Sequence, residues 1–260
     1  IIMVEGDAEN ILVPIIADIL GYPLEKYGVS IVNVGSTAFL RYSGIMIRKD
    51  GSCIGIPVSV ITDCDVRPYD IAEDTNEKVF NEKTLESTRI ENEKNEKYTS
   101  GSVRGFTSSR WTLEYCIAMS CLSEDFHKSV HYGKKILNAR EHISLTDEKI
   151  SEADQEVTKE VAEWKELPPW RKAYEIYSLM LDKDGKSGLK AIVAQCLASI
   201  LRWKTSIIPE EIKQEKMFDL DLYRLRTDAQ KKAELKSKIE EDQFLSYIVK
   251  AIKYAAGENV

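Results

Sequence analysis

Residues 1–21, IIMVEGDAENILVPIIADILG, predict a short buried strand that runs directly into a helix. The apolar run 1–4 suits a buried strand, and apolar residues then recur at helical spacing over residues 8–20. Gly6 permits a tight turn between the two, and Gly21 is placed to end the helix. A strand followed at once by a helix is the opening half of a βαβ unit.

The next apolar runs continue this alternation. Residues 29–34, VSIVNV, and residues 56–62, IPVSVIT, are rich in β-branched side chains and predict two further strands. Residues 38–48 between them have helical spacing, and residues 103–107 are a candidate fourth strand. The pattern predicts an α/β domain in which helices cover both faces of a parallel sheet.

The rest of the chain changes in character twice. Residues 70–100 are almost entirely charged or amide side chains, which predicts a solvated helix or a mobile insertion. From Trp111 onward the spacing of apolar residues is helical throughout. We therefore expect two domains, residues 1–122 with the sheet and residues 123–260 all helical.

Acidic residues follow two of the predicted strands at the points where the strands end. Glu5 and Glu9 come after the first strand, and Asp63 and Asp65 come after the third. In open parallel sheets, ligands bind beyond the carboxyl ends of the strands. Four carboxylates at one edge would repel one another, and hard oxygen ligands of this kind suit Mg²⁺ or Mn²⁺. The sequence therefore predicts a divalent-metal site at this edge.

VEGDAE at residues 4–9 and TDCD at residues 62–65 resemble the motif glutamate and the Asp-x-Asp pair of a Toprim domain, a Rossmann-like parallel sheet flanked by helices. The wider matches are similar to the nuclease half of the OLD (overcoming lysogenisation defect) family of ATP-dependent endonucleases. These matches are VEGDAENILVP, VSIVNVGSTAFLRY, IPVSVITDCDVRP, WTLEYCIA at 111–118 and KAIVAQCLA at 190–198. The resemblance spans about residues 1–120 and 186–200.

This resemblance implies a metal-dependent DNA endonuclease or nickase that hydrolyses phosphodiester bonds with two Mg²⁺ or Mn²⁺ ions. Lys190, contributed by the helical domain, falls on the family's active-site lysine. The family's metal-site positions fall on Glu5 (also a catalytic residue), Glu9, Asp63, Asp65 and Glu114, with Thr112 at a hydroxyl position.

The resemblance also implies partners. Full-length OLD proteins pair the nuclease with an ATPase domain, which we expect to lie outside this chain. The expected partners are therefore DNA, that ATPase domain and a helicase, in a homo-oligomer that serves antiphage defence or DNA processing.

The charge balance narrows the function classes. The chain has 36 basic and 43 acidic side chains, a net charge of −7, which excludes charge-driven coating of nucleic acid as the main activity. No apolar run approaches the roughly 18 residues that a membrane span needs. The five cysteines are odd in number and form no C-x-x-C pair. We expect a cytoplasmic protein with reduced thiols and no membrane partner.

Two other motifs fall short of a site. Residues 185–187, GKS, resemble the end of a phosphate-binding loop, but the earlier glycine of that motif would fall at Met180. His127 and His131 are four apart on a predicted helix, but Lys128 stands where a zinc protease has its glutamate. With no third ligand evident, the sequence predicts neither an ATP site nor a zinc site.

A non-catalytic role is the alternative, in which the Toprim part serves as a scaffold or regulatory interaction domain. The missing ATPase and a helical domain without an assigned role favour it. None of the twelve tyrosines lies in a motif that marks a topoisomerase nucleophile. The endonuclease hypothesis ranks first because the acidic motifs and the lysine occur together.

Overall fold

The computed structural model describes residues 1–46, 55–138, 145–181, 189–207 and 226–260. In chain order its elements are β1 (Ile2–Val4), α1 (Asp7–Leu20), β2 (Ile31–Asn33), α2 (Phe39–Ser43), β3 (Val58–Thr62), β4 (Tyr69–Ile71), β5 (Lys78–Phe80), α3 (Thr84–Tyr98), β6 (Val103–Thr107), α4 (Leu113–Met119), α5 (Ser123–Leu137), α6 (Asp147–Glu163), α7 (Pro169–Ser178), α8 (Lys190–Lys204), β7 (Ser206–Ile207), β8 (Arg226–Thr227), α9 (Ala229–Glu241) and α10 (Ser246–Ala255).

The central sheet has four parallel strands in the order β2-β1-β3-β6. All four are the predicted strands, each within or at the bounds that the apolar runs indicate. The predicted α/β fold with a parallel sheet is therefore confirmed. The helix expected over residues 38–48 is the shorter α2, and residues 47–54 lie outside the described part of the chain.

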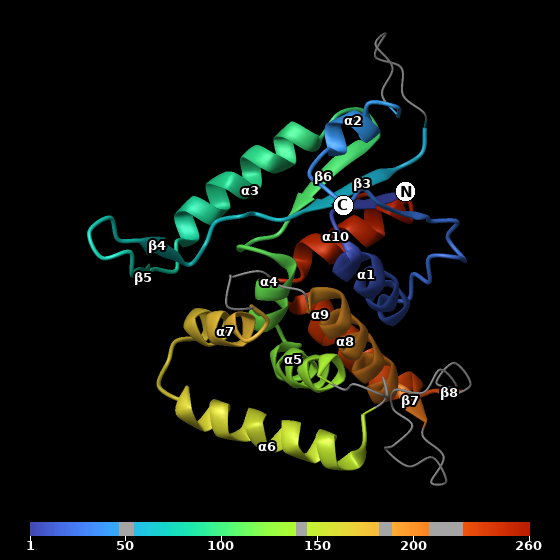
Figure 1. Ribbon diagram of the computed structural model, residues 1–260. Coiled ribbons are helices and arrows are strands. Elements are labelled where there is room, and N and C mark those ends of the chain that lie inside the picture. Colours follow the sequence, from blue (N-terminus) through green and yellow to red (C-terminus); the bar gives the residue numbers. More distant parts are fainter. Residues whose placement is uncertain (47–54, 139–144, 182–188, 208–225) are drawn as a thin grey trace.

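Strands β1, β3 and β6 each contribute side chains to two apolar cores, because successive side chains of a strand point to opposite faces of the sheet. Ile2 lies in the core that the sheet shares with α1 and α10. Its neighbour Met3 lies in a second core, with Phe39 of α2 and Tyr98 of α3. Figure 1 shows the same layers, with α2 and α3 on one side of the sheet and α1 and α10 on the other.

The first helix ends as its sequence predicts. Gly21 is the C-cap of α1, with a φ of 92° that only glycine adopts without strain. Its backbone N–H and that of Tyr22 bond to carbonyl groups of the last turn. The cap therefore ends α1 at Leu20.

The charged segment 70–100 forms regular secondary structure that packs on the sheet, although its composition resembles that of a solvated segment. It forms the antiparallel pair β4–β5 and the helix α3, which packs against β6. Ser87 and Tyr98 are its buried residues, and the remainder of α3 faces outward or is partly covered. Of the two alternatives predicted for this segment, a solvated helix or a mobile insertion, the helix is confirmed. It packs on one face of the sheet.

The later helices do not stay apart from the sheet. α8 packs against α1 and α5, while α10 packs against β1, β3 and β6. The hydroxyl of Ser59 in β3 donates to the carbonyl of Ala251 in α10 at 2.7 Å. The short antiparallel pair β7–β8 is an addition to the all-helical pattern expected after Trp111. The boundary near residue 122 stays a prediction.

Among the described residues, no helix is both long enough and apolar enough to cross a membrane.

Candidate active site

Four acidic side chains lie where β1 and β3 end and where α1 and α4 begin. Glu5 directly follows β1, and Asp63 directly follows β3. Glu9 lies in the first turn of α1, and Glu114 in the first turn of α4. Because β1 and β3 are parallel neighbours, their carboxyl ends meet at one edge of the sheet. The fold thus gathers these four carboxylates from three separate stretches of the chain.

Hydrogen bonds fix two of the carboxylates to the backbone around them. Glu5 Oε1 accepts from the hydroxyl of Thr62 and, at 3.2 Å, from the backbone N–H of Asp63. Asp63 Oδ1 in turn accepts from the backbone N–H of Leu113 at 2.8 Å, at the start of α4. The ends of β1 and β3 and the beginning of α4 are therefore linked through these carboxylates.

Lys190, which is 76 residues after Glu114 in the sequence, lies beside the acidic cluster. It is the first residue of α8, and the packing of α8 against α1 brings it over the acidic cluster. Its Nζ lies 3.0 Å from Glu114 Oε2. The Glu114 side chain is 4% exposed and that of Lys190 is 37% exposed, so solvent reaches the pair from the lysine side.

The carboxylates perturb one another's protonation. Burial raises the pKa of Glu9 to about 7, and the negative charges of Glu114 and Glu5 add to the shift. Burial, followed by Glu114 and Glu9, also raises the pKa of Asp63 well above its ordinary value. Both shifts mean that a full set of charged carboxylates is unfavourable here without a cation.

Lys190 is the cation that the described chain supplies to this group. Burial alone would lower its pKa, but the charges of Glu114, Tyr177 and Asp63 outweigh burial and raise it. The lysine therefore stays protonated. One positive charge against four carboxyl groups leaves a surplus of negative charge.

The site fits divalent cations by its donor set and by its excess of buried negative charge. Among the described residues, no three of these carboxylates bring ligand oxygens within 4.8 Å of one another. The described carboxylates therefore form no closed cage of protein oxygens, and an ion held here would keep some of its water ligands.

Asp65 and Thr112 have other partners. Asp65 adopts a φ of 68°, is exposed, and pairs with Lys94 of α3 at 2.6 Å. Thr112 is the N-cap of α4, and its hydroxyl accepts from the backbone N–H of Tyr115 at 3.3 Å. The structure therefore does not place these two side chains in the acidic cluster, and their role as metal ligands stays a prediction.

Two tyrosines beside the cluster carry no signal in the sequence. Tyr177 of α7 interacts with the charges of Lys190 and Glu114, and burial raises its pKa to about 12. Tyr247 of α10 is buried, and its hydroxyl has no hydrogen-bond partner in the described structure. Burial, and then the nearby Cys116 and Asp63, raise the pKa of Tyr247. Both residues reach the site only through the packing of distant helices.

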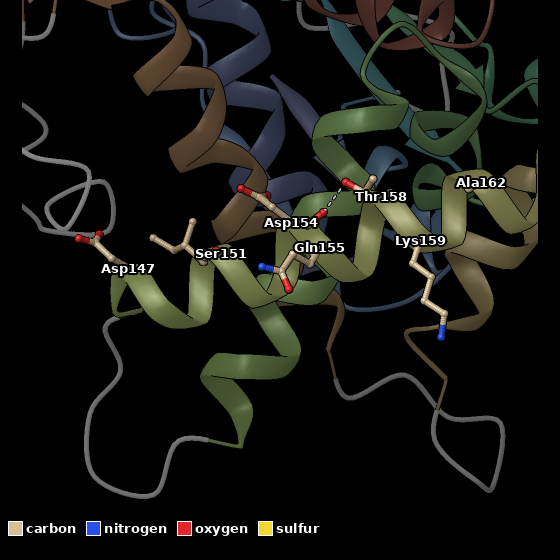
Figure 2. A pocket seen from close by; sticks show the side chains of 8 residues that line it. Asp147, Ser151, Asp154, Gln155, Thr158, Lys159 and Ala162 are labelled. Atoms are coloured by element: carbon tan, nitrogen blue, oxygen red, sulfur yellow. Dashed lines mark hydrogen bonds between the residues drawn. The ribbon is translucent and has the colours of Figure 1, made fainter.

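A shallow groove elsewhere on the surface is separate from this cluster. Figure 2 shows it along α6, with the side chains of Asp154, Gln155 and Lys159 along its length. Among the residues that the structure describes, those that line it all belong to α6.

Comparison with known proteins agrees with the sheet and its acidic edge. Residues 1–65 match the family model described as overcoming lysogenization defect protein-like, TOPRIM domain. The resemblance inferred from the acidic motifs is therefore confirmed over this segment, which contains β1, α1, β2, α2 and β3. No curated protein matches the chain.

Two solved structures are similar over nearly their whole length. The C-terminal region of the Burkholderia pseudomallei OLD protein aligns with a TM-score of 0.46 and 18% identity, covering 98% of this chain and 97% of that chain. The C-terminal region of the Xanthomonas campestris pv. campestris OLD protein aligns with a TM-score of 0.40 and 20% identity, covering 96% and 94%.

Proposed function

We propose that this chain, whose first 65 residues form an OLD-like TOPRIM segment, is a divalent-metal-dependent DNA endonuclease or nickase. Toprim domains generally bind divalent metals, and a nuclease-type module is the activity class that the segment supports. The observation that carries the proposal is the convergence of Glu5, Glu9, Asp63 and Glu114 with Lys190 at one sheet edge.

Each residue has a definable task in phosphodiester hydrolysis. The four carboxylates would hold two Mg²⁺ or Mn²⁺ ions. When bound, such ions supply activation of a water molecule and stabilisation of the leaving oxygen. Lys190 is exposed enough to reach a phosphate, and its protonated amine offsets negative charge that develops in the transition state. Lys94 occupies Oδ2 of Asp65, which leaves Oδ1 of that carboxylate as the oxygen that would bind an ion.

The proposed setting is a larger OLD-like protein that acts on DNA in antiphage defence or DNA processing. Its ATPase domain, a helicase and further copies of the same protein are the partners in this proposal. The acidic net charge of −7 makes bound cations a condition for DNA to approach the site.

Plasmid nicking tests the proposal. Supercoiled plasmid incubated with the purified chain and Mn²⁺ should become nicked or linear, and EDTA should stop the reaction. Asp63→Asn should reduce the rate at least about 100-fold, and Lys190→Gln about 100- to 1,000-fold, as expected for loss of a charge that stabilises the transition state. Glu25→Gln, at an exposed position outside the cluster, should leave the rate unchanged.

The non-catalytic alternative predicts a different result in the same assay. If the wild type and Asp63→Asn leave the plasmid equally intact with Mg²⁺ and with Mn²⁺, the endonuclease proposal fails. Calorimetric titration with Mn²⁺ then tests whether the carboxylates still bind a cation. Saturable binding that Glu5→Ala weakens would support a regulatory metal site, and no binding would support a scaffold.

A further inference from the structure

A second group of metal-ligating side chains lies in the helical part of the chain. His127 and His131 are one turn apart on α5, and Glu160 comes from α6. One ligand atom from each lies within 4.8 Å of the other two, the tightest such group among the described residues. Glu160 Oε2 is 2.7 Å from Nε2 of both histidines. The sequence shows no third ligand because Glu160 is 33 residues from His127 and joins it only when α6 packs on α5.

The contacts of His131 favour a positive charge between its Nε2 and Glu160. Its Nδ1 lies 2.7 Å from Glu156 Oε2, and its Nε2 lies 2.7 Å from Glu160 Oε2. A neutral imidazole carries a proton on one nitrogen only. When Nδ1–H donates to Glu156, the lone pair of a neutral Nε2 faces a carboxylate oxygen, and either a second proton or a metal cation between them removes the repulsion.

The same arrangement is the one that histidine ligands adopt around zinc. A metal-ligating histidine usually donates its other ring N–H to a carboxylate, which fixes the tautomer and the ring orientation. Glu156 is that carboxylate for His131. Lys135 holds Glu156 in turn, with its Nζ 3.0 Å from Glu156 Oε1. Two Nε2 atoms and one carboxylate form the His₂Glu set of a zinc site with an open fourth position.

The surroundings of the group suit such an ion. The side chains of His127 and His131 are 2% and 4% exposed, and that of Glu160 is 20% exposed. The Trp164 indole stacks on the His127 ring, with centroids 5.3 Å apart and an interplanar angle of 18°, and so fixes the ring. The 2.7 Å separations are hydrogen-bond lengths, so Glu160 must turn outward to allow metal–ligand bonds of about 2.0–2.2 Å.

A groove lies beside the group, although His127 is the only one of the three proposed ligands among its described lining residues. His127 and Trp164 line a groove of about 600 Å³ that α5, α6 and α7 form together. The described lining of the groove in Figure 2 comes from α6, whereas this groove brings residues of three helices together.

We propose that His127, His131 and Glu160 bind a zinc ion that joins α5 to α6, at a site separate from the strand-end carboxylates. The nitrogen ligands favour Zn²⁺ and related transition metals over Mg²⁺, which prefers oxygen. Because the ligands come from two helices, the bound ion stabilises the packing of α6 on α5.

Metal titration of the full chain tests this site. With excess Mg²⁺ present, Zn²⁺ should bind and raise the melting temperature, and Co²⁺ should give a visible spectrum without a thiolate charge-transfer band. Glu160→Gln and His131→Gln should each weaken Zn²⁺ binding at least about 100-fold, and Glu156→Gln about 10- to 100-fold. Glu163→Gln, exposed on the same helix, is the matched control and should bind as the wild type does.

Circular dichroism establishes that each variant is folded. If His131→Gln unfolds, the Zn²⁺ affinities of Glu160→Gln and Glu156→Gln test the site instead, since glutamine keeps the shape of the glutamate side chain. Equal Zn²⁺ affinity in Glu160→Gln and Glu163→Gln would overturn the proposal. A folded wild type that shows neither a zinc-dependent rise in melting temperature nor a cobalt spectrum would also overturn the proposal. A proton on Nε2 of His131 would then be what joins it to Glu160.

Discussion

Glu9 shows the effect of burial and of neighbouring carboxylates on the pKa of an acidic residue in this cluster. Its side chain is buried at the start of α1, and its pKa rises from 4.5 to about 7. A carboxyl group with that pKa is only partly ionised near neutral pH. The group therefore titrates in the pH range where the protein is expected to work, and a divalent cation bound as proposed would displace its proton.

The first residue-scale prediction concerns stability and pH in the absence of metal. Between pH about 4.5 and about 7 the folded chain binds more protons at Glu9 than the unfolded chain does, so the free energy of unfolding falls as pH rises. At about 1.4 kcal/mol per pKa unit, the loss attributable to Glu9 is up to about 3 kcal/mol. Urea unfolding in EDTA at about pH 5 and about pH 8 measures it.

Glu9→Gln should flatten this dependence, and Mn²⁺ should restore stability to the wild type at the higher pH. Glu25→Gln is the control at an exposed position. An unchanged pH dependence in Glu9→Gln would contradict the assignment of the shift to this carboxyl group.

The residues of the cluster differ in how far sequence reasoning could reach them. Glu5, Glu9 and Asp63 follow from strand ends and spacing alone, because the carboxyl ends of parallel strands share an edge. The association of Lys190 with them needed the family resemblance, since a single lysine on a helix is ordinarily solvated. Tyr247 could not be predicted at all, because only the packing of α10 brings its buried hydroxyl to the site.

At the scale of elements, α3 shows how a highly charged segment can be a structural layer. Its backbone approaches β6 closely, and Asn95 Oδ1 accepts from the backbone N–H of Thr107 at 2.7 Å. Lys94, also on α3, donates to the carbonyl of Asp63 and to the carboxylate of Asp65 at 2.6 Å each. The helix therefore supports the loop that follows β3.

Gly105 of β6 is what permits this close approach. A Cβ at this position would lie 3.0 Å from the carbonyl oxygen of Asn95 and 3.0 Å from Cβ of Tyr98. Gly105→Ala should therefore push α3 away from the sheet and lower the free energy of unfolding by about 1–3 kcal/mol. Urea unfolding measures the change. Gly55→Ala has open space around its Cβ and should have little effect, and equal effects of the two substitutions would refute this role of Gly105.

The strands and α1 were predictable because their apolar periodicity is set by burial on a sheet. The packing of α3 was not, because only Ser87 and Tyr98 of its residues are buried and the rest of its sequence resembles a solvated helix. Gly105 alone hints at the contact, as a glycine inside a strand.

At the scale of the whole molecule, α10 joins the end of the described chain to the sheet. Ala251 and Ile252 are fully buried, and α10 contacts α1 and α9 as well as β1, β3 and β6. It also carries Tyr247 to the acidic cluster. One face of the sheet therefore shares a core with α5, α7, α8, α9 and α10, while α6 packs in a separate cluster with α5 and α8. We expect the sheet and the helices of the shared core to unfold together.

Ile252→Ala tests that expectation. Deleting a buried isoleucine side chain should cost about 2–5 kcal/mol and shift a single unfolding transition to lower urea concentration. Lys250→Ala, exposed on the same helix, should shift it little. Transitions that separate when followed by tryptophan fluorescence and by far-ultraviolet circular dichroism would show instead that the two parts unfold independently.

The position of α10 over the sheet also has a consequence during protein synthesis. A ribosome completes β6 well before it makes α10, and at ~5–20 residues per second the interval is on the order of ten seconds. Throughout that interval the nascent chain exposes the apolar sheet face that α10 later covers. The strand-end carboxylates reach their final surroundings only after α8 and α10 have emerged, so a half-made chain carries the acidic residues without the assembled site.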